Sequence, residues 1–228
     1  MICRVADLYV QIPEAGGIAS RCGEYLASGT ADILITEDSY NLDRWQGMPY
    51  EDACYMESGF HFYGKLIQHS GMMCHASAVA YQGKAYLFSG PSTVGKSTHT
   101  RQWQKSFADV RVFNDDKPAL RLLDGQWFAY GTPWCGKDGI NENLKVPLGG
   151  ICFLKQGPQN RIRRLQPREA LGYVLSQTWQ FRKPENQELH MRLVDDLLRN
   201  IPIFELENVP GEEAAIMSRE ALLTAAEA

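Results

Sequence analysis

The chain lacks any long run of apolar residues. None of its segments approaches the roughly 20 consecutive apolar residues that a membrane-spanning helix needs. Residues 1–7, MICRVAD, also lack the apolar stretch of a secretory signal peptide. We therefore expect a cytoplasmic protein without a membrane partner.

Positive charge is not in excess either. The chain has 23 Lys and Arg residues against 27 Asp and Glu residues, a formal net charge of −4. A nucleic-acid surface needs a basic patch, so we expect no nucleic-acid partner. None of the 6 cysteines forms a C-x-x-C pair or stands at metal-finger spacing with a histidine. This predicts reduced thiols, several of them in the core.

What the chain does have is enough apolar sequence for a core, with 44% hydrophobic residues in 228. The pattern predicts a small β-rich N-terminal lobe at residues 1–70 and a second domain at 71–228. In the lobe we expect strands at 4–12 and 31–36 and a helix at 51–69. The second domain is predicted to have strands at 72–80, 84–88, 110–116, 119–123, 126–130, 146–155 and 203–207, and helices at 98–105, 167–179, 184–200 and from Ser218 onward.

The strongest motif fits G-x-x-x-x-G-K-[ST], a loop that binds the phosphates of a nucleotide. It lies between a predicted strand and a predicted helix, the context that the motif needs. The two glycines let the backbone turn so that its N–H groups point inward, the lysine supplies a cation for the phosphates, and the serine can ligate Mg²⁺. The predicted nucleotide-binding residues are Gly90, Pro91, Ser92, Thr93, Val94, Gly95, Lys96, Ser97 and Thr98.

Two adjacent acids, Asp115 and Asp116, end a later apolar strand. Strand ends converge on the phosphate site in nucleotide enzymes, where carboxylates meet Mg²⁺ or an acceptor hydroxyl. On an extended chain the two acids point to opposite faces, so one can serve each role. If the two acids stood alone, a solvated turn would be the favoured interpretation. Because they follow the phosphate loop by one helix and one strand, we interpret them as catalytic residues.

A histidine, His75, begins the hairpin whose second strand runs into Gly90. Antiparallel pairing brings the start of the first strand to the end of the second, so His75 is expected beside the phosphates. The Gly-rich and Trp-containing loop at 130–138 is another candidate. Its Lys137, and the side chains of residues 141–145, are weighed as contacts to an anionic substrate or metal against an ordinary solvated loop.

Together, His75, the loop at 90–98 and the acids at 114–116 resemble the catalytic domain of HPr kinase/phosphorylase, over residues 70–155. That family shares a fold group with ATP-dependent phosphoenolpyruvate carboxykinase. The resemblance implies an α/β fold with α+β character: a P-loop core of this type with a mixed sheet, and a helical C-terminal part. It also favours a homo-oligomer.

The resemblance implies a role for each residue. Lys96 grips the phosphates of ATP, Ser97 holds Mg²⁺, and His75 contacts the transferred phosphate. One of Asp115 and Asp116 acts as the base on the acceptor hydroxyl and the other lies near the metal. We take Asp116 with Ser97 as metal ligands, while the choice of base stays open.

The chain departs from the family at three places. The family has Gly in place of Thr93, an acid in place of Thr98, and a Glu-Val-Arg-Gly-Leu-Gly-like segment in place of residues 129–134. We therefore expect a divergent member whose acceptor is not HPr.

The leading hypothesis is an ATP- and Mg²⁺-dependent kinase that phosphorylates a serine-like hydroxyl on a peptide, a protein or a small molecule. The alternative is a nucleotide-dependent switch that hydrolyses ATP slowly and acts through a partner protein. A carboxykinase-like enzyme is a third, for which the chain lacks an evident set of arginines.

Overall fold

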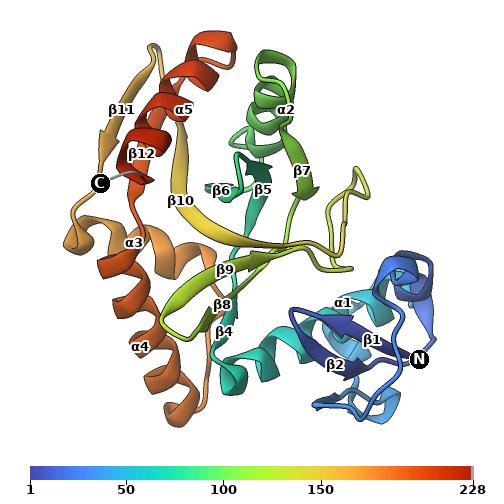
Figure 1. Cartoon of the computed structure of the whole chain (residues 1–228). Coiled ribbons are helices and arrows are strands. Elements are labelled where there is room, and N and C mark those ends of the chain that lie inside the picture. The colour runs from blue at the N-terminus through green and yellow to red at the C-terminus, as the bar shows by residue number, and fades with distance from the viewer. Residues whose placement is uncertain (227–228) are drawn as a thin grey trace.

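The computed structural model describes residues 1–226 and shows a mixed α/β fold with a curled mixed sheet (Figure 1). The expected mixed sheet is thus confirmed. Its strands are β4 (Gly71–Met73), β5 (Ala76–Tyr81), β6 (Lys84–Ser89), β7 (Arg111–Asn114), β8 (Ala119–Leu123), β9 (Gln126–Tyr130), β10 (Lys145–Gln156), β11 (Arg161–Arg164) and β12 (Ile203–Asn208). The order is β4-β8-β9-β10-β6-β5-β7, and β12 pairs with β10 and β11.

Strand β10 joins the two parts of the sheet. Its first residues, 145–147, pair with β9 in the antiparallel sense. Further along, β10 pairs in parallel with β6 on one side and β12 on the other. A single strand therefore passes from an antiparallel to a parallel environment, and the sheet curls along it (Figure 1).

Helices cover both faces of the parallel part. They are α2 (Lys96–Ser106), α3 (Pro167–Gln177), α4 (Pro184–Asn200) and α5 (Glu212–Ala226). Successive side chains of a strand point to opposite faces. Accordingly Leu87 of β6 packs in the core with Val194 of α4, while Phe88 packs in the core with Trp103 of α2 and Leu222 of α5. Both faces of β6 are buried, which explains its nearly continuous apolar sequence.

The last helix begins earlier than predicted. It was expected from Ser218, but α5 starts at Glu212, directly after Pro210 and Gly211. Glu212 and Glu213 lie in its first turn, where negative charge favours a helix N-terminus. Residues 227 and 228 of the expected domain 71–228 lie outside the described part.

The N-terminal lobe contains β1 (Ile2–Val5), β2 (Leu8–Gln11), β3 (Ile33–Leu34) and α1 (Tyr50–Leu66). The single strand predicted at 4–12 is wrong, because β1 and β2 form an antiparallel hairpin. Ala6 and Asp7 turn the chain with φ values of 52° and 61°. Five short 3₁₀ helices complete the described elements: η1 (Gly16–Arg21), η2 (Gly23–Tyr25), η3 (Glu37–Ser39), η4 (Leu42–Trp45) and η5 (Ile67–His69).

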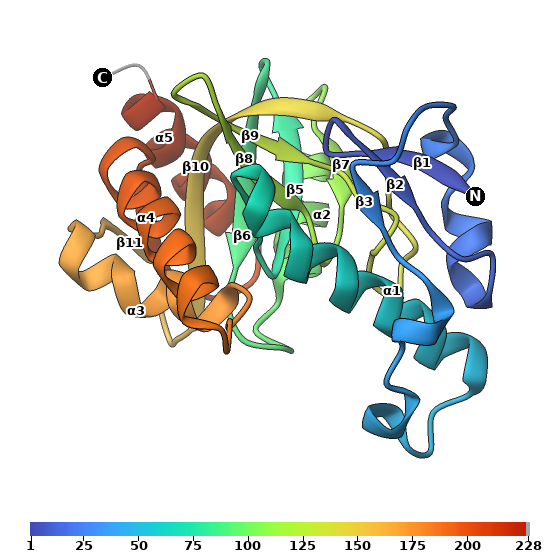
Figure 2. The ribbon, with the colours of Figure 1, turned by 90° about the horizontal axis from the view of Figure 1, so that it is seen from below.

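Helix α1 connects this lobe to the main sheet (Figure 2). Phe62 of α1 packs in one core with Val10 of β2, with Tyr130 of β9 and with Trp134 of the following loop. Arg121 of β8 also donates a hydrogen bond to the carbonyl oxygen of Ala6 at 2.7 Å. The lobe and the main sheet therefore share a core.

The start of β5 and the ends of β6 and β7 lie close together at one end of the sheet's strands. Ala76, the first residue of β5, pairs with Ser89, the last residue of β6. Ala78 of β5 pairs with Asn114 at the end of β7. Loops that follow β6 and β7 and precede β5 therefore lie together. Within residues 1–226, no helix has both the length and the apolar content needed to cross a bilayer.

Candidate active site

The loop at residues 90–95 joins the end of β6 to the start of α2. The strand–loop–helix arrangement predicted from the motif is present. Gly90 and Gly95 have φ values of 141° and 106°, in the region that favours glycine. A Cβ on Gly90 would also come within 3.0 Å of the carbonyl oxygen of Leu154. Thr93 adopts a left-handed φ of 69° as well, so three residues bend this loop.

Lys96 is the first residue of α2 and is buried. Its amine donates hydrogen bonds to the carbonyl oxygens of Gly90 at 3.0 Å and Pro91 at 3.3 Å. Burial lowers the pKa of Lys96, and the negative charge of Asp116 partly offsets this. The hydrogen bonds of Lys96 thus connect the loop to α2. The amine also lies near enough to Asp116 for that negative charge to raise its pKa. Ser97 is half-buried in the same first turn.

A hollow of about 350 Å³ lies against this loop. Residues 91–94 form one side of it, and Leu154, Lys155, Gln156 and Tyr173 form the rest. Gln156 donates a hydrogen bond to the carbonyl oxygen of Thr93 at 3.4 Å. Small-molecule pockets typically span roughly 300–1,000 Å³, so the hollow has the size of a ligand site.

His75 and Asp116 lie in contact, a pairing that the sequence analysis did not predict. The Nε2 atom of His75 is 3.2 Å from Oδ1 of Asp116. Lys117 forms an ion pair with the other carboxylate oxygen, Oδ2. Burial alone would raise the pKa of Asp116, but the hydrogen bond from His75 and the charge of Lys117 lower it well below its usual range. Asp116 is therefore an ionised acid at neutral pH.

Gln177, at the end of α3, belongs to the same cluster. Its Oε1 atom is 3.0 Å from Nδ1 of His75, and its carbonyl oxygen accepts the N–H of His75 at 2.8 Å. The sequence analysis missed this residue. It is 102 positions from His75, and no local pattern marks a glutamine at a helix end as a partner for a histidine.

Asp115 points away from His75. Its Oδ1 atom accepts the N–H of Gly136 at 2.6 Å, in the loop at 130–138. Burial raises the pKa of Asp115, although the hydrogen bond from Gly136 opposes this. A Cβ on Gly136 would lie 2.9 Å from Oδ2 of Asp115, so the loop approaches the acid closely. The two acids therefore have different partners, and Asp116 is the one in contact with His75.

Asn114 holds the turn that separates the two acids. Its Oδ1 atom accepts the N–H groups of Asp116 at 3.1 Å and Lys117 at 2.8 Å. Its Nδ2 atom donates to the carbonyl oxygen of Thr132 at 3.0 Å. Since Asn114 is fully buried, these bonds fix the direction in which Asp116 leaves the strand.

Residues 130–145 were candidates for contacts to an anionic substrate or a metal. Most of their side chains instead contact other parts of the protein. Trp134 is buried against Phe62, with ring centroids 4.7 Å apart, and Lys137 is exposed. The remaining candidates contact the N-terminal lobe or a neighbouring strand. Their partners are Arg21 for Asn141, Arg111 for Glu142, Glu24 for Asn143 and Asp7 for Lys145.

The oxygen atoms near the loop suit Mg²⁺. This ion usually takes one or two protein oxygens and completes its shell with water and substrate phosphates. Ser97 offers a half-buried hydroxyl, and Asp116 offers an ionised, half-buried carboxylate. Among the described residues there is no cluster of three or more His, Cys, Asp or Glu that could hold a metal by itself. Binding of Mg²⁺ here would therefore depend on a bound nucleotide.

The fold and this edge of the sheet define a mixed α/β protein with a candidate phosphate-binding loop beside a histidine–aspartate pair. The chain belongs to the family described as SynChlorMet cassette protein ScmC, whose model matches residues 53–212. None of the curated proteins matches it. Among solved structures, the Hpr(Ser) kinase/phosphatase from Coxiella burnetii is 13% identical, covering 67% of this chain and 88% of that chain, with a TM-score of 0.39. The expected likeness to HPr kinase is thus a distant structural resemblance.

Proposed function

We propose that this protein is an ATP- and Mg²⁺-dependent phosphotransferase that acts on a hydroxyl group. The observation that carries the proposal is the contact between His75 and Asp116 at the sheet edge where the loop at 90–95 begins. A phosphate-binding loop and an acid that can accept the hydroxyl proton are groups that phosphoryl transfer uses, and here His75 contacts the acid.

Nucleotide binding is assigned to the loop and the start of α2. Lys96 and the N–H groups of the loop and the first helical turn bind the phosphates, because these donors have no partner within the helix itself. The hollow beside residues 91–94 takes the nucleoside part. Mg²⁺ would neutralise phosphate charge during transfer, and Ser97 would supply a ligand to it.

Asp116 is assigned as the acceptor of the hydroxyl proton. It is ionised at neutral pH, and His75 holds one of its oxygens. The other assignment has Asp115 as base and Asp116 on the metal, but Asp115 bonds to the loop at Gly136 and is not the acid in contact with His75. We favour Asp116 as base because of its contact with His75. Its other oxygen would be released from Lys117 for the proton, with Mg²⁺ held by Ser97 and the nucleotide. We regard Asp115 as the acid that holds the loop at 130–138.

The test is transfer of label from γ-labelled ATP with Mg²⁺ to pooled hydroxyl-bearing peptides and small molecules. A general base contributes about 10²–10⁴-fold, so Asp116→Asn is expected to lower transfer by at least about 100-fold. Asp124→Asn is the matched control, because Asp124 lies in the β8–β9 turn with a φ of 50° that asparagine tolerates. Label that appears only in inorganic phosphate would instead support the nucleotide-dependent switch.

A further inference from the structure

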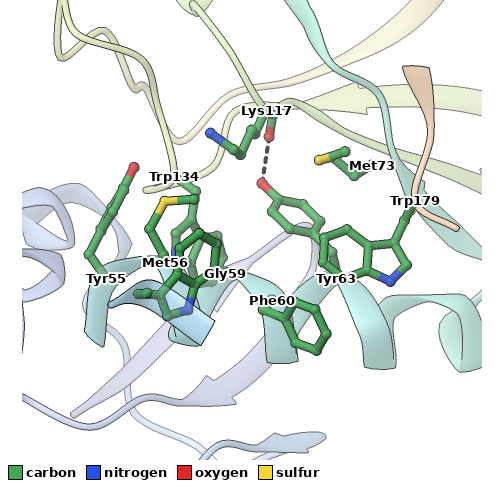
Figure 3. Close-up of a pocket in the computed structure, with 10 residues that line it drawn as sticks. Tyr55, Met56, Gly59, Phe60, Tyr63, Met73, Lys117, Trp134 and Trp179 are labelled. Carbon is green, nitrogen blue, oxygen red and sulfur yellow. Dashed lines mark hydrogen bonds between the residues drawn. The ribbon is translucent and has the colours of Figure 1, made fainter. Parts of the chain in front are cut away.

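A cavity of about 120 Å³, shown in Figure 3, is lined mainly by aromatic and methionine side chains. Helix α1 provides much of its lining, with Tyr55, Met56, Gly59, Phe60 and Tyr63. These residues recur at helical spacing, so one face of α1 borders the cavity.

Three further lining residues come from segments that also contain the polar cluster of His75, Asp116 and Gln177, and the remaining two are Trp45 of η4 and Trp134 of the loop at 130–138. Met73 lies two residues before His75, and Lys117 directly follows Asp116. Trp179 lies two residues after Gln177, the second partner of His75. Three separate segments thus give one residue to the cavity and one to the cluster. The cavity and the His75–Asp116 pair are adjacent parts of one site.

Most polar side-chain atoms of the lining have protein partners, including Nε1 of Trp45, which donates to Glu57, and Nζ of Lys117, which pairs with Asp116. The hydroxyl of Tyr63 donates to the carbonyl oxygen of Lys117 at 2.5 Å, as Figure 3 shows. The hydroxyl of Tyr55 donates to the carbonyl oxygen of Cys135 at 3.0 Å, and Nε1 of Trp134 donates to Ser58 at 3.0 Å. The cavity therefore presents mainly ring faces and methionine side chains. Such a lining favours an apolar, aromatic occupant over a sugar or a charged group.

The size of the cavity limits the occupant further. An apolar cavity of about 150 Å³ takes one benzene molecule. At about 120 Å³, this cavity suits a single six-membered ring and is small for a nucleoside. Met56, Phe60, Met73 and Trp179 are half-buried, so part of the lining reaches solvent and a ring can enter from outside.

We propose that this cavity binds an aromatic ring carried by the phosphate acceptor, so that the acceptor's hydroxyl faces Asp116. The inference rests on the proposed function and narrows its substrate class to aromatic compounds and to peptides with an aromatic side chain near the hydroxyl. The nucleotide lies at the other part of the site, against residues 91–94.

The first experiment measures ring binding without any phosphate transfer. The probe is N-acetylphenylalaninamide, followed by ligand-detected NMR, with N-acetylalaninamide as the non-aromatic control. Met56→Trp fills the cavity from α1 and is expected to weaken binding of the aromatic probe at least tenfold. Met191→Trp is the matched control, because Met191 is 44% exposed on α4 and lies outside the cavity lining.

A second filling variant, Met73→Phe, approaches from the opposite chain segment and guards against misfolding of the first. Thermal unfolding confirms that each variant is folded before binding is compared. Equal binding of the aromatic probe by wild type and both folded filling variants would overturn the inference. So would equal binding of the two probes by the wild-type protein.

The second experiment separates this inference from the proposed function. Serine peptides that carry Phe or Ala at each neighbouring position are offered with γ-labelled ATP and Mg²⁺. The inference expects Phe to raise labelling at one or more positions, and Met56→Trp to remove that preference. Labelling that is the same for Phe and Ala everywhere overturns the inference and leaves the kinase proposal standing. Probe binding without transfer to any acceptor overturns the kinase proposal instead.

Discussion

The imidazole of His75 lies between Asp116 and Gln177, with Nε2 3.2 Å from the carboxylate and Nδ1 3.0 Å from the amide oxygen. Both ring nitrogens are therefore occupied by groups from distant parts of the chain. The backbone N–H of His75 is also bonded to Gln177. These contacts fix the ring against Asp116.

The first prediction concerns Gln177 as a positioning residue. Gln177→Leu keeps the approximate volume but cannot bond the ring of His75. One such bond is worth about 0.5–1.5 kcal/mol, so kcat for phosphate transfer should fall about 2- to 13-fold. The KM for ATP should stay unchanged, because Gln177 does not contact the loop. Gln159→Leu, in the exposed β10–β11 turn, is the control and should keep both constants. A rise in KM alone would contradict the assignment.

The second prediction concerns Lys96 and nucleotide binding. Lys96→Met removes the buried cation and should weaken ATP binding about 13- to 160-fold, the factor that corresponds to about 1.5–3 kcal/mol for a charged hydrogen bond. Isothermal titration calorimetry with ATP and Mg²⁺ measures it. Lys105→Met changes an exposed lysine on the same helix and should bind ATP as the wild type does. Equal affinity in both variants would remove the loop from the proposed site.

The third prediction concerns stability in acid. The pKa of Asp116 is lowered in the folded state, so the unfolded chain takes up a proton first as the pH falls below about 4. The stability contributed by Asp116 is present above that value and is lost as the pH falls toward its folded pKa. Asp116→Asn should therefore show a shallower loss of unfolding free energy between about pH 5 and pH 3 than the wild type.

Asp115 should affect the pH dependence of the unfolding free energy in the opposite direction. Its pKa is raised by burial, so the folded state takes up a proton before the unfolded chain does as the pH falls. Its removal in Asp115→Asn should make the loss of stability on acidification steeper. Urea unfolding of both variants across this range measures the two slopes. Parallel curves for the two variants would mean that the acids share one environment, against the structure.

The fourth prediction uses two glycines of α1. A Cβ on Gly59 would lie 2.8 Å from Cδ1 of buried Trp134, whereas nothing lies within 4 Å of one on Gly64. Gly59→Ala should destabilise the protein by about 1–3 kcal/mol through overpacking. Gly64→Ala should stabilise it by about 0.5–1 kcal/mol, because alanine favours a helix over glycine. Denaturant unfolding compares the two, and effects of the same sign would contradict the packing of Trp134 on α1.

Features that depend on residues close together in the sequence could be predicted. The loop at 90–95 was found because its glycines, lysine and serine form a contiguous motif between an apolar strand and a helix. The place of His75 followed from one hairpin, since the turn at Gln82 and Gly83 sets the register that brings Ala76 opposite Ser89. The break at Ala6 and Asp7 was missed, because Asp7 is the only usual turn former there and the apolar alternation continues across it.

Features that join distant segments came only from the folded chain. Asp115 and Asp116 are neighbours with the same side chain, and the sequence could not say which would face His75. The direction is set by the bonds of Asn114 to the turn and by the approach of Gly136 to Asp115. Likewise, nothing local to α1 shows that its aromatic face borders a cavity and does not simply fill a core.

The amino-acid sequence therefore determined the phosphate-loop motif and the hairpin that leads into it, because short-range backbone preferences and strand periodicity govern these features. Tertiary packing decided the partners of His75, the different environments of the two acids and the aromatic cavity at Lys117. These depend on contacts between residues as far apart as Met73, Lys117 and Trp179, whose proximity exists only once the strands and helices have packed.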